Sequence, residues 1–567
     1  MKKWFRPAMK EYFLLYPVIL FCAVFFLSAS FFQKIPWLDV AGLVSVFLFC
    51  KLRNICVTRW STAIYIYIYI YIYKCVFAAV VFLSLSIFFC YRLTHRQFEM
   101  GDLSLICDSG VNEFFEFLLT PEYLLLIFSG ILVVLLLGIH ELISRRLNRV
   151  LPEDLKLSSC SLRLLYVVSA LLGCVTLLQG SLIGIRYPRQ LLKEYIGGEM
   201  RTRCLVRDFA AGRKYAAHFL QQSDCRLSAN RKPVVCILIV GESAAAQAME
   251  CYGGPVKNTP FLSGRTSAFS GDLVLVRNSY ALDNLTTYVY HPMLSNSDHV
   301  SNLSVPRSIF LFDICRFLKI PTWMISNQPA KGTSISEIEY SADKTIFPYD
   351  NPLKNCALLD KITPPDEIIL PALEDVLNQL DSERGALIVL HLFGSHFPFR
   401  NRLPEHYQTL LSRNGYTDKE FYYFQTIEYT DRLLAQICRI AESKISMPFF
   451  ICYVSDHGED PSGRIYRGSR SLLGNVAAFF EIPCAFMLSR RYSELYPEKL
   501  NNLKMNSGKI FINDHIFDSI LDAMGCETSD TTISAPEKSL FSNSYEQKLE
   551  GVRALNRSVP LSKLLKL

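Results

Sequence analysis

Long apolar segments near the N-terminus limit how this chain can fold more than any other feature. A helix of about 20 apolar residues crosses the hydrocarbon core of a membrane. The whole chain is 50% hydrophobic yet 20% charged, a balance that favours a membrane part joined to a soluble part. We predict five spans within a transmembrane domain, residues 1–187, at Glu11–Phe32, Trp37–Leu52, Ala63–Cys90, Tyr123–His140 and Leu162–Ile185.

The charges between these segments predict their orientation. Cytoplasmic loops of membrane proteins are rich in Lys and Arg. Acidic residues instead dominate the loop 91–122. This pattern predicts a cytoplasmic N-terminus, retained as an anchor, with everything after Tyr187 on the other side of the membrane. The basic residues lie before the first span, between the second and third, and between the fourth and fifth: Lys2, Lys3, Arg6, Lys10; Lys51, Arg53, Arg59; Arg145, Arg146, Arg149, Lys156.

Five consecutive Ile-Tyr dipeptides occupy Ile64–Tyr73, at the start of the third predicted span. The alternation is typical of a strand, but lipid does not tolerate an unpaired strand, so a helix is expected. An alternating A-T tract also encodes Ile-Tyr repeats. We therefore hypothesise a slippage-prone DNA repeat that could switch the protein on and off by frameshift, which mixed codons in the gene would contradict. The alternative is an ordinary tyrosine-rich span.

The part after the spans has a different pattern. Residues 188–232 are polar and are predicted to link the spans to the next domain along the membrane surface. From residue 233 short apolar runs alternate with amphipathic stretches, which predicts an α/β domain, 233–567, with a mostly parallel central sheet. The strands are expected at Val234–Ser243, Ala386–His391 and Phe449–Ser455, and the helices at Asp366–Leu380 and Phe421–Glu442.

Charge and cysteine usage exclude several classes of function. The net charge of +7 is mild, and no basic run is interleaved with aromatic residues, so nucleic-acid binding is not expected. None of the cysteines after Tyr187 forms a CxxC pair, which argues against a zinc ribbon or a thioredoxin-type site.

Polar residues follow two of the predicted strands. Glu242 ends Val234–Ser243, and Asp456 and His457 follow Phe449–Ser455. Alone, an Asp-His-Gly sequence is more often a structural turn at the end of a strand than a metal site. Because the carboxyl ends of parallel strands meet at one edge of a sheet, however, we expect the three side chains to lie together. Carboxylate oxygens and imidazole nitrogens are zinc ligands, so a zinc site is predicted there.

A nucleophile beside such a site has three candidates. The segment Ser279–Ser295 offers Thr286 and Thr287, and Ser243 follows Glu242 directly. A hydroxyl on zinc has a lowered pKa and can attack phosphorus. Residue chemistry alone does not choose among the three.

The motifs GES, NTPFL, TTYVYHPMLS, LHLFGSHFPF, YVSDHGED and EIP follow one another along the chain. In this order they resemble the phosphoethanolamine transferases of Gram-negative inner membranes, members of the alkaline phosphatase/sulfatase superfamily, over nearly the whole chain. The shorter motifs are closer to the branch that modifies core oligosaccharide. The resemblance implies a periplasmic catalytic domain that moves phosphoethanolamine from phosphatidylethanolamine to lipopolysaccharide.

The resemblance also implies residue roles. Glu242, Thr286, Asp456 and His457 take the positions of the zinc ligands, and Thr286 that of the nucleophile that carries the transferred group. His396 matches a histidine that contacts the substrate phosphate or a second metal ion. The pair Asp366-Glu367 matches a helix-opening pair and is expected to be structural.

The chain departs from the family pattern at two places. Arg467 stands where many relatives have a second histidine. It cannot bind zinc but could hold a phosphate bidentately, so one zinc ion is expected and a second is left open. Leu282 and Pro292 occupy the places where lipid A-modifying relatives have paired cysteines, so that disulfide is absent.

Two rival functions remain open from the sequence. The same site could transfer glycerol phosphate or hydrolyse a phosphodiester or sulfate ester, although no C/S-x-P-x-R pattern surrounds Thr286. Alternatively, the protein could be a catalytically degenerate relative that only binds lipid.

Overall fold

The computed structural model describes residues 209–229, 231–328, 334–348, 364–413, 415–461, 476–547, 553–554 and 559–564. The five predicted spans, the Ile-Tyr tract and Arg467 lie outside these ranges. Within them, no helix has both the length and the apolar character needed to cross a membrane.

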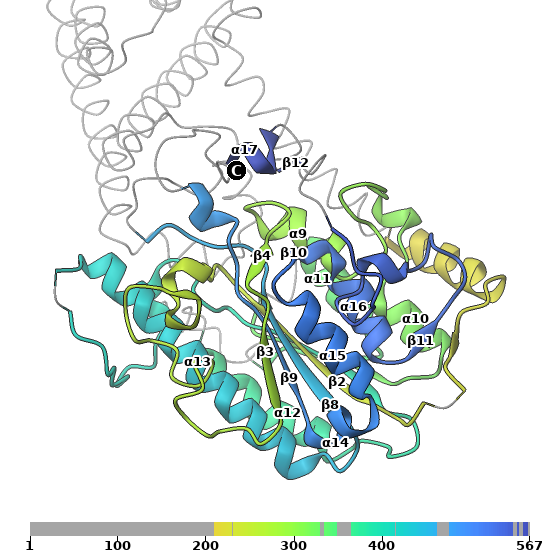
Figure 1. Cartoon of the computed structure of the whole chain (residues 1–567), viewed down its shortest axis with the longest axis horizontal. Coiled ribbons are helices and arrows are strands. Elements are labelled where there is room, and N and C mark those ends of the chain that lie inside the picture. The colour runs from red at the N-terminus through yellow and green to blue at the C-terminus, as the bar shows by residue number, and fades with distance from the viewer. Residues whose placement is uncertain are drawn as a thin grey trace, which may run out of the picture. The chain divides into compact units, whose positions relative to one another are not determined.

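A seven-stranded sheet forms the centre of the described part (Figure 1), with the strand order β3-β9-β8-β2-β7-β5-β6. Neighbours from β8 to β6 pair in parallel, and β9 runs antiparallel to both β8 and β3. The predicted α/β domain with a mostly parallel sheet is therefore confirmed. The strands are β2 (Val235–Gly241), β3 (Asp272–Leu275), β5 (Thr322–Ser326), β6 (Lys344–Ile346), β7 (Ala386–His391), β8 (Phe449–Ser455) and β9 (Cys484–Leu488).

The three predicted strands lie next to one another at the centre of this sheet. Every residue of β2, β7 and β8 is buried, because helices cover both faces of the sheet. In β2, Cys236 and Leu238 enter one hydrophobic core, while Ile237 and Ile239 enter the core on the opposite face. The unbroken apolar runs seen in the sequence follow from this burial on two sides.

Helices pack on both faces of the sheet. Figure 1 shows α12 and α13 on one side of the strands and α10, α15 and α16 on the other. Residues 209–221 are also helical. The remaining bounds are α9 (Thr286–Met293), α10 (Leu311–Phe317), α11 (Ser334–Glu339), α12 (Ile369–Leu377), α13 (Asp418–Lys444), α14 (Arg490–Leu495), α15 (Pro497–Asn506), α16 (Ile516–Ala523) and α17 (Leu561–Leu564).

Short strands and single turns complete the fold. The strand β4 (Asn278–Tyr280) pairs in parallel with β10 (Ile510–Ile512), which brings the chain before α9 beside the turn η8 (Asn513–His515). Two small antiparallel pairs join β1 (Arg226–Leu227) to β11 (Cys526–Glu527) and β12 (Arg553–Ala554) to β13 (Val559–Pro560).

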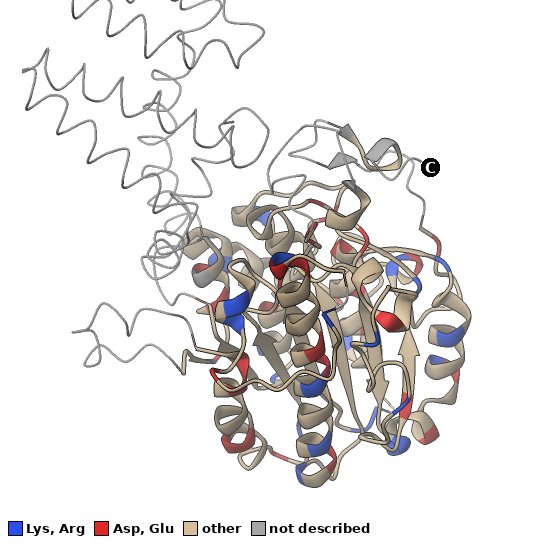
Figure 2. Cartoon of the chain, turned by 90° about the vertical axis from the view of Figure 1, so that its left-hand side faces the viewer, with Lys and Arg blue, Asp and Glu red and all other residues tan. Residues whose placement is uncertain are grey.

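Charged residues of both signs are spread along the chain in the ribbon of Figure 2. Lys and Arg alternate with Asp and Glu along the helices that face the viewer, while the strands carry few charges. This distribution agrees with the mild net charge of the sequence.

Candidate active site

Two neighbouring strands deliver the polar residues of the site to one edge of the sheet. β2 and β8 pair in parallel as far as Gly241 and Ser455, so the residues that follow them leave the sheet side by side. The Asp456 amide donates to Gly241 O at 3.1 Å, which holds the two strand ends together beyond the last pair. Glu242, Asp456 and His457 are all buried.

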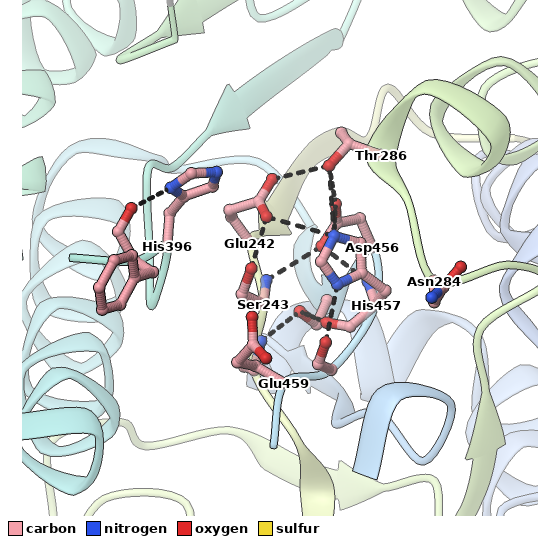
Figure 3. Close-up of polar contacts among 12 residues, drawn as sticks. Glu242, Ser243, Asn284, Thr286, His396, Asp456, His457 and Glu459 are labelled. Atoms are coloured by element: carbon pink, nitrogen blue, oxygen red, sulfur yellow. Dashed lines mark hydrogen bonds and ion pairs between the residues drawn. The ribbon is translucent and has the colours of Figure 1, made fainter. Parts of the chain in front are cut away.

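Thr286 reaches these residues from a different element. It is the first residue of α9, and its Oγ1 lies 3.0 Å from Glu242 Oε2 and 2.6 Å from Asp456 Oδ2 (Figure 3). His457 Nε2 lies 3.4 Å from the same oxygen. The structure therefore brings together all four residues that were predicted to form the zinc site.

The arrangement of lone pairs in this cluster calls for a cation. A hydroxyl has one proton, so Thr286 can donate to only one of the two carboxylates that it contacts. His457 Nδ1 lies 2.8 Å from Gly458 O and donates to it, so a neutral ring carries its lone pair on Nε2. That nitrogen lies 3.3 Å from Glu242 Oε1 and 3.3 Å from Asp456 Oδ2, both of which are also acceptors.

A metal ion would satisfy these facing acceptors. The ligand atoms of Glu242, Asp456 and His457 all lie within 4.8 Å of one another. Two carboxylates, one imidazole and one hydroxyl form a donor set that suits zinc. The residues present therefore fit the predicted ion.

Backbone amides hold the carboxylates in their orientations. Asp456 Oδ1 accepts from the amides of Ser243, at 3.1 Å, and His457, at 2.6 Å, which leaves Oδ2 directed at Thr286. Ser243 has a left-handed φ of 60°, and its hydroxyl donates to Glu242 Oε1 at 2.6 Å. Ser243 thus orients Glu242.

These contacts separate the three candidate nucleophiles. Ser243 is fully buried and its hydroxyl is directed at Glu242, so a substrate cannot reach it. Thr286 and Thr287 are both half-buried, but the side chain of Thr287 makes no hydrogen bond within the described ranges, whereas Thr286 contacts both carboxylates. The geometry favours Thr286.

His396 lies on a loop that packs against Glu242. The Ser395 amide donates to Glu242 O at 2.9 Å, and His396 Nδ1 lies 2.6 Å from Phe397 O. Figure 3 shows His396 beside the cluster, with its dashed line leading to the backbone of the next residue. The structure therefore places His396 next to the site, and its predicted phosphate contact stays a prediction.

Asp366 holds the same loop from another segment. Its buried carboxylate accepts from the amides of Phe393, at 2.7 Å, and Gly394, at 2.8 Å, and from Asn327 Nδ2 at 2.8 Å. Burial raises the pKa of Asp366 in spite of these three donors. Asp366 was expected to be structural because it opens a helix; its contacts show that it holds the loop beside Glu242.

Several residues that support the site were not found from the sequence. Asn513 Nδ2 donates to Asp456 O at 2.7 Å, while its Oδ1 accepts from the Leu282 amide at 3.0 Å. Tyr423 OH accepts from the Ala245 amide and donates to Ser243 O, each at 2.9 Å. An isolated asparagine and a tyrosine within a long helix carry no sequence signal for such contacts.

The cysteines that fall within the described ranges are all unpaired: Cys225, Cys236, Cys251, Cys315, Cys438, Cys452, Cys484 and Cys526. Burial raises the pKa of Cys236 and Cys452 well above the ordinary value for a thiol. These thiols are therefore protonated and packed as apolar side chains.

Comparison with known proteins identifies relatives of this chain. The sequence profile of the sulfatase family matches residues 235–525. The phosphoethanolamine transferase OpgE of Escherichia coli is 30% identical over 227 residues, which are 39% of this chain and 39% of that protein. The phosphoethanolamine transferase EptA of Helicobacter pylori is 28% identical over 242 residues, 41% of this chain and 43% of that protein. The matches thus span less than half the length of these curated relatives.

Among solved structures, the chain is similar to the integral membrane protein lipooligosaccharide phosphoethanolamine transferase A from Neisseria meningitidis. The TM-score is 0.59 at 16% identity, and the match covers 88% of this chain and 97% of that one. At this identity the likeness shows the fold, which agrees with the α/β domain described above.

Proposed function

Because the chain belongs to the sulfatase family, we propose that it is a zinc-dependent phosphoethanolamine transferase of a bacterial inner membrane. The donor would be phosphatidylethanolamine and the acceptor a sugar or lipid A phosphate of lipopolysaccharide. The single observation that carries this proposal is the Thr286 hydroxyl, which lies against Glu242, Asp456 and His457. The names of OpgE and EptA support the choice of transferred group.

The proposed reaction has two displacements at phosphorus. In the first, Thr286 Oγ1 forms a bond to the phosphorus of phosphatidylethanolamine while the bond to the diacylglycerol oxygen breaks. Thr286 loses a proton and the departing diacylglycerol gains one. In the second, an acceptor hydroxyl oxygen forms a bond to the same phosphorus and loses its proton. The bond from phosphorus to Thr286 Oγ1 breaks, Thr286 regains a proton, and the acceptor carries phosphoethanolamine.

The residues around Thr286 have separate roles in this scheme. Glu242, Asp456, His457 and Thr286 would hold the zinc ion. When bound, zinc lowers the pKa of a coordinated hydroxyl and offsets the charge that develops on phosphoryl oxygens. Thr286 is also the first residue of α9, where the positive end of the helix dipole favours an alkoxide. His396 and Arg467 are proposed to contact the substrate phosphate.

The proposal includes an arrangement of domains that suits this function. Residues 1–187 would be the transmembrane domain, 188–232 the linker and 233–567 the periplasmic catalytic domain. Anchoring the site near the lipid headgroups would raise the effective concentration of a donor and an acceptor that both reside in membranes. The similar Neisseria protein is an integral membrane protein by name, which supports this arrangement.

Intact-mass analysis tests the proposal directly. The full-length protein in detergent, loaded with zinc, is incubated with phosphatidylethanolamine, with phosphatidylglycerol or without lipid. We expect the mass of one phosphoethanolamine group to appear with the first lipid only, on Thr286, and to be absent from Thr286→Ala. A glycerol phosphate adduct from phosphatidylglycerol would instead support the rival transferase.

Two further outcomes complete this test. An enzyme that forms no adduct with either lipid while zinc is bound would contradict covalent transfer and favour the degenerate alternative. Mass spectrometry of lipopolysaccharide from cells with and without the gene then identifies the acceptor.

A further inference from the structure

A second group of metal-ligating side chains lies outside the site described above. His299, on the loop that follows α9, meets Asp514 and His515 of η8. One ligand atom from each of these residues can be chosen so that all three lie within 4.8 Å of one another. His299 Nδ1 lies 2.7 Å from Asp514 Oδ2, and the two imidazole rings stack with centroids 5.7 Å apart.

Part of this group has no hydrogen-bond partner. Asp514 Oδ1 and His515 Nδ1 are both buried and have no hydrogen-bond partner within the described ranges, although Asp514 Oδ1 lies 4.0 Å from His515 Nε2. The side chain of Asp514 is 0% exposed and that of His515 is 5% exposed. A buried polar atom left without a partner destabilises the folded state, so two such atoms in one cluster call for a ligand.

The surroundings of the group favour a cation over an anion. Asp298 adds a second buried carboxylate beside it, and Lys538 Nζ lies 2.7 Å from Asp298 Oδ2. The charge of Lys538 neutralises that of Asp298. When both histidines are neutral, the carboxylate of Asp514 is therefore the charge that no partner compensates. The side chain of His299 is 10% exposed, so an ion can approach from the surface.

We propose that His299, Asp514 and His515 bind a second divalent transition metal ion, with zinc as the first choice. Two imidazoles and one carboxylate are a frequent zinc ligand set, and three protein ligands leave a fourth tetrahedral position for water or another donor. The site is distinct from the one at Thr286, since it shares no ligand residue with it.

The proposed ion would join two segments that both lead to the Thr286 site. His299 follows the helix that begins with Thr286, and Asp514 and His515 follow Asn513 directly. Asn513 in turn contacts Asp456 O and the Leu282 amide. The second ion thus has a positioning role, because it would fix the end of the α9 segment against the turn that supports Asp456.

Metal content of the full-length protein in detergent tests this inference. The protein is stripped with a chelator, reloaded with zinc, desalted and analysed for zinc per chain by mass spectrometry. We expect about two zinc ions per wild-type chain and about one in Asp514→Asn and His515→Ala. Asp456→Asn should also retain about one zinc ion per chain. The double variant Asp456→Asn/His515→Ala should retain close to none.

The matched control is His406→Ala, which removes an exposed histidine far in sequence from both groups and should leave the zinc content unchanged. If the wild type held only about one zinc ion per chain and His515→Ala held as many, the inference would be overturned. A folded Asp514→Asn that held as many zinc ions per chain as the wild type would overturn it too. Loss of zinc in Asp456→Asn but not in His515→Ala would leave the proposed function intact, so the two proposals fail separately.

A second measurement needs no variant and so does not depend on folding of the mutants. Wild-type protein, stripped or zinc-loaded, is treated with diethyl pyrocarbonate, and modified histidines are mapped by peptide mass spectrometry. Zinc should protect His299 several-fold while leaving His406 equally reactive. Equal modification of His299 in both samples would contradict the site.

Discussion

Gly394 shows how closely the single residues of the site are fitted together. Its φ is +53°, and a Cβ at this position would lie 2.7 Å from Glu242 O and 2.9 Å from Glu242 N. Such a contact is with backbone and cannot be relieved by rotating a side chain. We expect Gly394→Ala to displace Glu242, weaken zinc binding and slow transfer by roughly tenfold to a hundredfold, as measured by zinc titration and turnover.

Gly264→Ala is the matched control for this prediction. Gly264 also has a positive φ, +70°, but a Cβ there would meet nothing within 4 Å. Both variants bear the strain of a left-handed alanine, about 1–2 kcal/mol, so their difference isolates the contact with Glu242. Equal zinc affinity in the two variants would show that the loop at Gly394 does not position Glu242.

Asn513 supports the site through both ends of its amide. Replacing it with leucine keeps the branching of the side chain but leaves Asp456 O and the Leu282 amide without their partners. We expect Asn513→Leu to lower the free energy of unfolding by about 2–3 kcal/mol and to reduce turnover, because the Asp456 loop loses its anchor. Thermal unfolding and transfer assays measure the two effects. Unchanged unfolding together with unchanged turnover would contradict this role.

The residues of the site differ in how far sequence alone could predict them. Glu242, Asp456 and His457 follow apolar strands, so a general rule about strand ends was enough to group them. Residue chemistry could not separate Thr286 from Ser243 and Thr287, because all three are hydroxyls near the same motifs. The family resemblance pointed to Thr286, and the contacts of its hydroxyl favour the same residue. Asn513 and Gly394 act through backbone contacts with distant segments, and such contacts leave no local pattern.

The helix α9 carries a histidine that should make the stability of the protein depend on pH. Burial, followed by the nearby charge of Arg213, lowers the pKa of His291 to about 4. Its Nε2 lies 2.8 Å from Ser308 Oγ. In the unfolded chain this imidazole takes up a proton near pH 6.5, so unfolding is favoured as the pH falls from about 6.5 towards 4.

We therefore expect His291→Gln to reduce the pH dependence of stability. Between pH 6.5 and 5 the wild type should lose on the order of 1 kcal/mol more than the variant. Thermal unfolding of both proteins across this range measures the difference. Parallel curves would indicate that His291 titrates normally in the folded protein.

Elements were predicted more reliably at the centre of the sheet than in the helices. The strands β7 and β8 have the predicted bounds, because a fully buried strand is an unbroken apolar run. The helix predicted at Asp366–Leu380 instead begins with a 3₁₀ turn, since Asp366 bonds the loop beside Glu242. The helix α13 begins three residues before the prediction, because Thr417 and Glu420 form a capping box.

The proposed membrane topology leads to a prediction for the whole molecule. Fusions of green fluorescent protein, which fluoresces in the cytoplasm, and alkaline phosphatase, which is active in the periplasm, are placed after Arg59, Asp102, Arg149 and Leu567. The alternation of charged loops predicts fluorescence after Arg59 and Arg149, and phosphatase activity after Asp102 and Leu567. A fluorescent C-terminal fusion would contradict the periplasmic location of the catalytic domain.

At this scale the sequence predicted the α/β class because strands and helices alternate over several hundred residues. The order of the strands could not be read in the same way. The neighbours β2 and β8 are separated by more than 200 residues, and β9 enters the sheet antiparallel to β8. Pairing over such separations depends on how the helices cover both faces, which is a property of the folded chain.

The division of labour between β2, β8 and α9 has an evolutionary consequence. Glu242, Asp456 and His457 directly follow two adjacent strands, while Thr286 belongs to a separate eight-residue helix. The nucleophile, which is also one of the proposed zinc ligands, can thus be exchanged by substitution within one short segment without rebuilding the other three ligands. Such independence would let one inherited scaffold acquire new attacking groups, and therefore new esters to cleave or to transfer, through changes confined to a few codons.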